Sequence, residues 1–348
     1  MKFGKNDAIL ITNPLNVFYL TNFTGSNAQV VITKKGKKYF LTDSRYKEQA
    51  NNELNSKYAI KIYKKFEKTL KEIIRKENIR KLGFEDKHLT YYQYITYSQN
   101  LDIALLPVGN CVEKLRLHKK KREIDNITKA VDIAEKSLEN VIGCMFKPLT
   151  KEIEFKILIE NEMIKNGASA SSFPTIVASG KRSSLVHGTA SHEILHVDDT
   201  VVIDFGAKYK GYCSDKTVTF VNKKSCKEVK DVYNIVKDAK NFAIDKIKPG
   251  VKANKIDKIA RDYIAKKGFG KYFQHALGHG VGVDVHEAPT ISPLSDDIIE
   301  ERMVFTVEPG IYIPDKFGIR LEDMVFVNNE NAELLTTPAE NFIFEDLI

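Results

Sequence analysis

The residues best suited to chemistry lie in one short segment, His275–Glu287, which reads HALGHGVGVDVHE. This segment contains three histidines, three glycines and two acidic residues within thirteen positions. Imidazole groups can coordinate a metal ion or move a proton near neutral pH, and glycines let a backbone pass close to a ligand. The segment therefore predicts one wall of a catalytic or metal-binding site, whose other groups must come from elsewhere in the chain.

Two aspartates upstream supply a first pair of carboxylates. Asp204 and Asp215 lie in the stretch VVIDFGAKYKGYCSD and flank a turn rich in lysine and glycine. If the flanking residues form a simple hairpin, the two side chains stand nearly opposite, with Cβ atoms about 4.5–5.5 Å apart. Two carboxylates at that distance repel each other, and one of them would stay protonated. Cations bound between the aspartates would remove this repulsion.

A second hairpin of the same design follows in FTVEPGIYIPDKFGIRLED. Glu308 and Glu322 flank its turn, around residues 314–318, and lie among apolar residues. A single acid in such a strand most often faces water, but two matching acid pairs are costly to bury without compensation. A pair of metal ions about 3.5–4 Å apart, bridged by carboxylates and completed by one imidazole, would provide that compensation.

A different metal site is suggested by the pentad His192–His196, which matches the HExxH pattern of zinc peptidases. In that pattern a helix places both histidines on one face, and the glutamate acts as the base. The pentad here lies between Gly188-Thr189 and residues 197–199, which leaves too little chain for such a helix. We therefore expect that replacing His192 leaves activity largely intact, whereas replacing His279 abolishes it.

The elements that must position these residues divide into two domains and predict an α+β protein. Residues 1–115 alternate between apolar runs and helical patterns, which indicates a small α/β domain, and Asn13-Pro14 is interpreted as a turn. Residues 116–348 open with two helices and continue with strands, and this order then repeats, which suggests an internal duplication. The expected strands are at 7–12, 28–33, 38–42, 81–84, 175–179, 200–206 and 211–221 and around 275, 303 and 319, and the expected helices at 43–52, 65–77, 89–99, 121–145, 150–165, 226–247 and 254–267.

Composition argues against several other classes of protein. The chain has 348 residues, of which 43% are hydrophobic, and a formal net charge of +8. Its lysines are scattered, and the compact basic run Lys119–Arg122 lacks a nucleic-acid recognition pattern, so no specific nucleic-acid partner is expected. No stretch approaches the ~20 apolar residues that a membrane span needs. Four widely spaced cysteines fit a reducing compartment, and a cytoplasmic location without a membrane partner is expected.

The acid pairs and the histidine segment resemble the metal site of the pita-bread dinuclear metallopeptidases, the family of methionine aminopeptidase, aminopeptidase P and prolidase. His279 matches the second histidine of the family's HxxGHG pattern. The resemblance implies a pita-bread fold for the C-terminal domain and two divalent metal ions, of which Asp215 and Glu322 would bridge both. The five implied ligands are Asp204, Asp215, His279, Glu308 and Glu322.

Other matches imply residues that act on the substrate. His286 corresponds to the histidine of the family's HE pair, which binds the scissile carbonyl or the tetrahedral intermediate, and His187 would contact the substrate near the leaving group. The proline-directed members match at three further positions that line the site, His275, Tyr312 and Arg320. Val218 and Val186 stand where relatives carry arginine and proline, which leaves the detail of the substrate pocket open.

The N-terminal third resembles the creatinase-like amino-terminal domain of aminopeptidase P proteins through its FTGS and DxRY stretches. Together these matches imply hydrolysis of the N-terminal Xaa-Pro peptide bond by a hydroxide held between two metal ions, with Glu308 as the base. The ligand set suits Mn²⁺, with Co²⁺ or Zn²⁺ as alternatives. We expect an Xaa-Pro aminopeptidase that acts on peptides with proline at the second position. A prolidase and a noncatalytic binding protein on the same fold are the alternatives, and relatives imply a homodimer.

Overall fold

The computed structural model describes residues 2–196, 199–222 and 225–341. The chain divides into two compact units, Met1–Arg116 and Leu117–Ile348, and the boundary expected after residue 115 lies next to this division. The hydrophobic residues gather into separate clusters, two in the first unit and one in the second. Each unit therefore has a core of its own.

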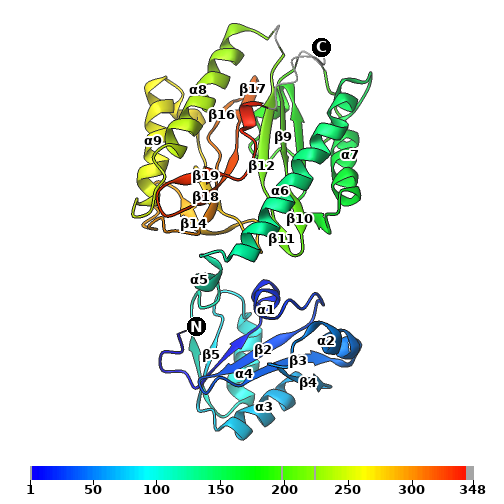
Figure 1. The fold of residues 1–348 in the computed structure, drawn as a ribbon, viewed down its shortest axis with the longest axis vertical. Helices are drawn as coiled ribbons and strands as arrows, with labels where there is room; N and C mark the ends of the chain where they lie inside the picture. The colour runs from blue at the N-terminus through cyan, green and yellow to red at the C-terminus, as the bar shows by residue number, and fades with distance from the viewer. Residues whose placement is uncertain (1, 197–198, 223–224, 342–348) are drawn as a thin grey trace. The chain divides into compact units, whose positions relative to one another are not determined.

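The first unit is built on a mixed sheet with the strand order β4-β3-β2-β1-β5-β6 (Figure 1). Strand β2 runs antiparallel to β1 and β3, whereas the other neighbouring strands run parallel. Successive residues of β1 belong to the two different clusters, so both faces of the sheet are covered by apolar side chains. The strands are β1 (Ala8–Ile11), β2 (Gln29–Thr33), β3 (Lys38–Asp43), β4 (Ala59–Tyr63), β5 (Lys81–Phe84) and β6 (Ala104–Pro107).

The first helix of this unit corrects the interpretation of Asn13-Pro14 as a turn. Asn13 caps helix α1 (Pro14–Thr21), because its side chain accepts a hydrogen bond of 2.9 Å from the backbone N–H of Leu15. Proline fits the first helical position, where its missing N–H has no helical partner to lose. The helix expected at 43–52 begins instead as the 3₁₀ turn Ser44–Tyr46. The remaining helices are α2 (Lys47–Glu53), α3 (Phe66–Glu77), α4 (Tyr91–Asn100) and α5 (Glu113–Arg116).

The second unit places a pair of helices on either side of its strands (Figure 1). Helices α6 (Lys121–Val141) and α7 (Glu152–Lys165) pack on each other and on the strands β8 (Ile176–Ser179), β10 (Ala207–Tyr209) and β11 (Tyr212–Cys213). Helices α8 (Lys227–Ile244) and α9 (Ala253–Lys266) pack on each other and on the strands β14 (Glu287–Ile291), β15 (Val304–Val307), β16 (Gly310–Ile313) and β17 (Phe317–Arg320). The expected duplication of two helices followed by strands is therefore confirmed. Helix α6 ends earlier than expected, since Ile142–Phe146 forms a 3₁₀ turn.

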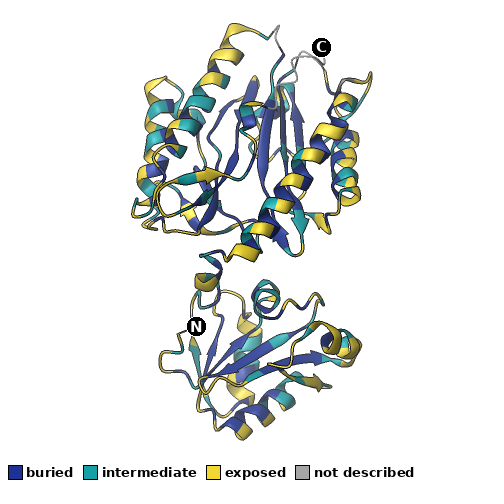
Figure 2. Cartoon of the chain, viewed as in Figure 1, coloured by how far each residue is buried: buried dark blue, intermediate teal, exposed yellow. Residues whose placement is uncertain are grey.

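The strands of the second unit lie buried between the helices, whose outer faces are exposed (Figure 2). Each of its sheets is antiparallel. The first half contributes β7 (Ala170–Ser171), β8 (Ile176–Ser179), β9 (Val201–Phe205), β10 (Ala207–Tyr209), β11 (Tyr212–Cys213) and β12 (Lys216–Phe220). The second half contributes β13 (Gly278–Gly280), β14 (Glu287–Ile291), β15 (Val304–Val307), β16 (Gly310–Ile313), β17 (Phe317–Arg320), β18 (Asp323–Val327) and β19 (Ala332–Leu334).

The hairpin of the two aspartates exists, but its register differs from the expected one. Asp204 pairs with Thr217 in the β9–β12 ladder, so the expectation that it stands opposite Asp215 was wrong. Lys210 and Gly211 form the two-residue turn, with φ of 46° and 82°. Positive φ at both positions is typical of a type I′ turn. Because this turn lies closer along the chain to Asp215 than to Asp204, the two aspartates do not stand opposite each other.

The hairpin of the two glutamates consists of two ladders, β15–β18 and β16–β17, which share one register and are separated by a short gap. The pairs Val307↔Asp323 and Gly310↔Arg320 are in register with each other, so Glu308 and Glu322 lie opposite in the gap between the two ladders. In this gap the N–H of Glu308 donates to the carbonyl of residue 277 at 2.8 Å, and the N–H of Glu322 donates to that of residue 217 at 3.0 Å. The two acids therefore lie where the hairpin passes from one sheet to another.

The glycines of the histidine segment are required by the packing of strands. A Cβ atom on Gly278 would lie 1.9 Å from the carbonyl oxygen of Thr306, and one on Gly280 would lie 2.1 Å from that of Ala288. Neighbouring backbone, rather than a bound ligand, therefore excludes a side chain at both positions. Among the described residues, the structure contains no helix long and apolar enough to cross a membrane.

Candidate metal centre

Three of the expected ligands converge on one point in the second unit. A side-chain nitrogen of His279 and one oxygen from each of Asp215 and Glu322 all lie within 4.8 Å of one another. His279 belongs to β13, whereas Asp215 and Glu322 immediately precede β12 and β18. Both acids are almost fully buried, with exposed fractions of 4% and 1%. Three separate stretches of chain therefore deliver ligand atoms to a site screened from water.

Glu308 joins this group through His279. The Nε2 atom of His279 lies 3.4 Å from Oε1 of Glu308 and 3.6 Å from Oδ2 of Asp215. Its Nδ1 atom lies 3.2 Å from the carbonyl oxygen of Gly280, which can only accept, so Nδ1 carries the proton and Nε2 a lone pair. Burial lowers the pKa of His279, which favours this neutral form. A lone pair that faces two ionised carboxylates is unfavourable unless a proton or a metal cation lies between them.

The carboxylates also need a cation. Burial first, and then the charge of Glu322, raises the pKa of Asp215 well above its ordinary value, and burial with the charge of Glu308 does the same to Glu322. Burial raises the pKa of Glu308 to about 8. Oδ1 of Asp204 and Oε1 of Glu322 are buried and have no hydrogen-bond partner among the described residues. Repelling acids with unpartnered oxygens are suited to holding a divalent cation.

Arg320 and Thr217 orient the carboxylates on two sides of the group. Arg320 donates from Nη2 to Oδ2 of Asp204 at 2.7 Å and from Nε to the hydroxyl of Thr217 at 3.0 Å. That hydroxyl in turn donates to Oε2 of Glu322 at 2.7 Å. Arg320 is only 3% exposed, and a guanidinium holds such a geometry firmly because it is planar and always charged.

The three residues expected to line the site form one chain of hydrogen bonds. Nη1 of Arg320 donates to the hydroxyl of Tyr312 at 3.0 Å, and this hydroxyl lies 3.0 Å from Nε2 of His275. Nδ1 of His275 lies 2.8 Å from the carbonyl oxygen of Ala276, so Nδ1 carries the proton and Nε2 accepts from Tyr312. Burial lowers the pKa of His275 to about 4, so the ring is neutral at pH 7.

The two remaining candidate histidines lie at different depths. The ring of His286 lies 4.3 Å from that of His279, centroid to centroid, at an interplanar angle of 63°. Burial lowers the pKa of His286, and the neighbouring His279 lowers it further, because two protonated rings this close together would repel each other. His187 is exposed on the loop between β8 and β9. It is close enough to His275 and His286 to contribute to the lowering of both pKa values.

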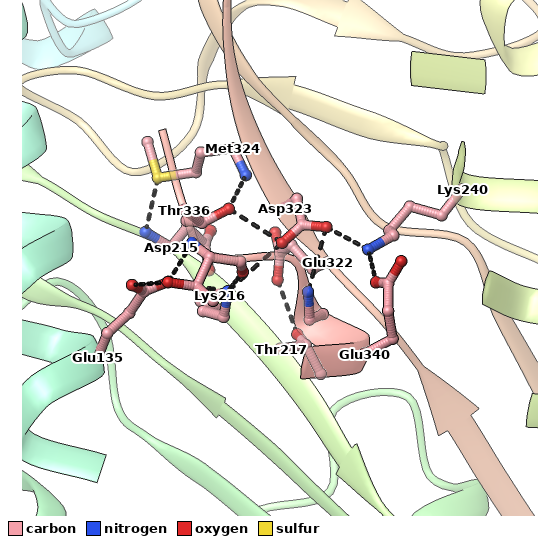
Figure 3. A network of polar contacts seen from close by, with 12 residues as sticks. Glu135, Asp215, Lys216, Thr217, Lys240, Glu322, Asp323, Met324, Thr336 and Glu340 are labelled. Atoms are coloured by element: carbon pink, nitrogen blue, oxygen red, sulfur yellow. Dashed lines mark hydrogen bonds and ion pairs between the residues drawn. The ribbon is translucent and has the colours of Figure 1, made fainter. Parts of the chain in front are cut away.

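Buried charges lie behind the ligands, on the far side of their strands (Figure 3). Lys216 follows Asp215, and Asp323 follows Glu322, so alternation along each strand turns the second residue away from the metal group. Nζ of Lys216 lies 2.9 Å from Oε1 of Glu135 and 3.4 Å from Oδ1 of Asp323. The strands that follow the candidate ligands Asp215 and Glu322 are therefore joined by the ion pair between Lys216 and Asp323.

A second lysine completes this network and ties in the end of the described chain (Figure 3). Lys240 of α8 is fully buried and forms ion pairs with Asp323 and Glu340. Oδ1 of Asp323 accepts from the hydroxyl of Thr336 at 3.0 Å, and Lys216 donates to the carbonyl of Thr337. The segment from residue 336 to 340 is thus attached to the strands that carry the ligands.

The HExxH pentad lies in an extended segment and serves a structural purpose. The first two backbone N–H groups of α7 donate to the carbonyls of Glu193 and Ser191 at 3.0 and 2.9 Å. The segment therefore satisfies N–H groups that the helix itself leaves without partners. His192 and His196 are exposed. The prediction that the pentad does not form a helix is confirmed.

The sequence analysis did not predict the residues that contact the candidate ligands or the strands next to them. Thr306 accepts from the N–H of His279 at 3.1 Å and donates to Oε1 of Glu308 at 3.2 Å. Its position two residues before Glu308 in an apolar strand places both on one face, and this signal was available in the sequence. The contacts of Lys216 and Lys240 were not predictable in the same way, since nothing in the spacing of lysines indicates burial.

Buried carboxylates around one imidazole, held by a duplicated unit of two helices and strands, define a metallopeptidase of the pita-bread class. Comparison with known proteins agrees. Residues 125–329 match the profile of metallopeptidase family M24, and residues 1–118 match the creatinase/prolidase N-terminal domain. The chain therefore belongs to metallopeptidase family M24.

Relatives of the chain extend over nearly its whole length. An uncharacterized peptidase of Bacillus subtilis is 42% identical and covers 97% of this chain and 96% of its own. The structure of an Xaa-Pro dipeptidase from Bacillus anthracis is 41% identical, with a TM-score of 0.92 over 95% of this chain and 93% of that one. An X-Pro aminopeptidase from Thermotoga maritima is 36% identical, with a TM-score of 0.88 over 95% and 96%. The pita-bread fold and the creatinase-like N-terminal domain are confirmed.

Proposed function

We propose that this peptidase is an Xaa-Pro aminopeptidase, which removes the first residue from peptides with proline at the second position. The observation that carries the proposal is the position of Nε2 of His279, which lies 3.6 Å from Oδ2 of Asp215 and 3.4 Å from Oε1 of Glu308. That arrangement is suited to a cation, and it lies in a chain of family M24 whose relatives include peptidases named for Xaa-Pro bonds.

The proposed cofactor is a pair of divalent metal ions per subunit, Mn²⁺ in preference to Co²⁺ or Zn²⁺. When bound, such ions polarise the scissile carbonyl and lower the pKa of water. The proposed ligands are the five residues Asp204, Asp215, His279, Glu308 and Glu322. Of these five, Asp215, His279 and Glu322 each have one ligand atom in the converging group and would hold the ions there.

The side chains around this group would then act on the peptide. Glu308, held by Thr306, takes the proton of the attacking water and passes it to the proline nitrogen as that nitrogen leaves. His286 donates a hydrogen bond to the oxyanion, and His187 contacts the substrate near the leaving group. The hydrogen-bonded chain of His275, Tyr312 and Arg320 fixes the wall beside the metal ligands.

The proposal is tested by rates of hydrolysis with Mn²⁺ supplied. We expect an Xaa-Pro-Pro tripeptide to be cleaved faster than the matching Xaa-Pro dipeptide, and a chelator to abolish cleavage of both. Cleavage that persists in the metal-free protein would contradict the metal-dependent mechanism. A protein that binds its metal ions but cleaves no Xaa-Pro peptide would instead be a noncatalytic binding protein.

A second candidate, Xaa-Pro dipeptidase, is favoured by one specific comparison. The solved structure from Bacillus anthracis that is 41% identical to this chain bears that name. The same pair of substrates distinguishes the two activities. A dipeptidase would cleave the dipeptide at least as fast as the tripeptide, and that result would overturn the aminopeptidase proposal.

A further inference from the structure

Both ends of the loop that carries His187 meet on a single buried carboxylate. Glu152, at the start of α7, is 0% exposed. Its Oε1 accepts from the N–H and the hydroxyl of Ser179 at 2.8 and 3.0 Å. Its Oε2 accepts from the N–H and the hydroxyl of Ser191 at 2.9 and 2.7 Å. One side chain therefore closes the base of the loop between these two serines.

Arg182 balances the buried charge and braces the loop from within. Its Nε donates to Oε2 of Glu152 at 3.0 Å, and its Nη2 donates to the carbonyl of Thr189. Glu152 thus accepts five hydrogen bonds, of which one comes from a guanidinium. A carboxylate buried with this set of donors is well compensated, but a replacement that lacked one oxygen would leave donors without a partner.

The middle of the loop is fastened to β17. The hydroxyl of Ser183 accepts from the N–H of Gly318 at 2.8 Å, and the carbonyl of Val186 accepts from Nη1 of Arg320 at 3.1 Å. A Cβ atom on Gly318 would lie 2.0 Å from the carbonyl oxygen of Ser183, so loop and strand are in close contact. Val186 immediately precedes His187. The loop is therefore fixed at its base by Glu152 and at its middle by β17, next to the histidine.

We propose that Glu152 is a positioning residue for His187: by holding both ends of the loop, it sets where that imidazole stands relative to the metal centre. The inference rests on the proposed function, in which His187 contacts the substrate. A carboxylate is needed because both of its oxygens accept. The side chain of glutamine has one accepting oxygen and one donating NH₂ group. Its oxygen can accept from one of the two serines, but its NH₂ group then faces the donors of the other serine.

The test is a double-mutant cycle between E152Q and H187A, measured as kcat/KM on an Xaa-Pro-Pro tripeptide. We expect E152Q alone to lower kcat/KM about 10-fold, because small displacements of a substrate-contacting group are costly to the rate. In an H187A background E152Q should have less than about a 2-fold further effect, since the pair is coupled. Additive effects in the cycle would mean that Glu152 does not act through His187, and they would overturn the proposal.

The control is E160Q, on the same helix. Oε1 of Glu160 also accepts from a backbone N–H, that of Thr175 at 3.2 Å, and it lies 3.8 Å from Nζ of Lys156. It does not hold the His187 loop, so E160Q should leave kcat/KM close to that of the unaltered protein. S191A removes one hydroxyl from the loop and keeps the backbone bond, and it should give a smaller loss than E152Q in the same direction. An S191A protein with unchanged kcat/KM would count against the proposal.

A second measurement does not depend on activity. Amide hydrogen exchange over residues 180–190 should be faster in E152Q than in the unaltered protein, whereas the amount of bound Mn²⁺ should be the same in both. Unchanged exchange would overturn the proposal even if activity fell. If the unaltered protein cleaved no Xaa-Pro peptide, the proposed function would fail on its own, and the exchange rates would still decide whether Glu152 holds the loop.

Discussion

At the level of single residues, the proton on His279 decides what the surrounding acids can bind. A doubly protonated ring would form ion pairs with Asp215 and Glu308, and no metal would be needed. Burial lowers its pKa, which favours a neutral ring. Because the one remaining proton lies on Nδ1, directed at a carbonyl oxygen, Nε2 presents a lone pair. The distances from Nε2 to the two carboxylates are therefore compatible with ion pairs if the ring is doubly protonated, and with a bound metal ion if the ring is neutral.

Replacement of His279 should remove metal binding, whereas replacement of His192 should not. We expect H279A to lower peptidase activity by at least about 100-fold, more than the loss of a residue that merely supports a ligand. H192A should keep activity close to that of the unaltered protein, because His192 lies exposed in the segment that caps α7. Both variants would be compared by their metal stoichiometry and by their rates of tripeptide hydrolysis. The reverse result would contradict the proposed ligands.

The hydroxyl of Thr217 should tune the affinity for metal. T217V keeps the shape of the side chain but removes the hydrogen bond to Glu322, and we expect the metal affinity to fall about 10- to 100-fold. T219V is the matched control, since the hydroxyl of Thr219 donates to the backbone carbonyl of Arg320 rather than to a ligand. Isothermal titration of the metal-free proteins with Mn²⁺ provides the comparison. Equal losses in the two variants would mean that general destabilisation, not ligand support, is responsible.

At the level of elements, the two hairpins show what spacing along a chain can predict. The positions of Glu308 and Glu322 about the turn correctly indicated that they face each other, because both flanking ladders keep one register. The same reasoning failed for Asp204 and Asp215. The turn there is set by Lys210-Gly211, where a lysine adopts positive φ, and residue preferences gave no warning of this. Local backbone geometry, rather than pattern, fixes which residues of a hairpin meet.

The buried lysine of α8 should be important for stability. In K240M the carboxylates of Asp323 and Glu340 lose their shared cation, although Asp323 keeps its ion pair with Lys216 at 3.4 Å. Removing one partner from a buried ion pair is expected to cost up to about 3–5 kcal/mol of the free energy of unfolding. K237M, a half-buried position on the same helix, serves as the control and should change stability by less than about 1 kcal/mol. Urea denaturation of the two variants measures the difference. A K240M protein as stable as K237M would show that the network contributes little.

The contribution of Glu340 should depend on pH. Burial opposes its ionisation, but Lys240 and Asn241 outweigh this and lower its pKa below the ordinary value of 4.5. A carboxyl whose pKa is lower in the folded state contributes stability above its unfolded pKa, and this contribution is lost as the pH falls. E340Q should therefore destabilise the protein at pH 7, and the difference from the unaltered protein should shrink below about pH 4.5. Urea midpoints measured across this range would contradict the idea if the difference stayed constant.

At the level of the whole molecule, the proposed metal site draws on one unit alone. All five proposed ligands lie in Leu117–Ile348, and the hydrophobic clusters of the two units are separate. Motifs were sufficient to locate the catalytic unit and to group its candidate residues. They were not sufficient to find the loop that Glu152 closes or the charges behind the strands, because those contacts depend on packing between segments far apart in the sequence.

This separation predicts how the molecule unfolds with and without metal. We expect two transitions in calorimetry, of which only the one that belongs to residues 117–348 moves to higher temperature when Mn²⁺ is added. At a free metal concentration 100 times the dissociation constant, binding should stabilise that unit by about 2.7 kcal/mol. A single transition, or a metal-dependent shift of both, would show that the two units do not unfold independently.

The single register shared by Glu308 and Glu322 has a consequence for how the chain can change in length. One residue inserted within β16 would turn the following side chains to the opposite face and spoil the ladder. Residues added at Pro314–Lys316, which are exposed and join β16 to β17, would leave both ladders in place. The tip of this hairpin is thus where evolution can lengthen the chain, and where an experimenter can attach a label, at little cost to the two glutamates.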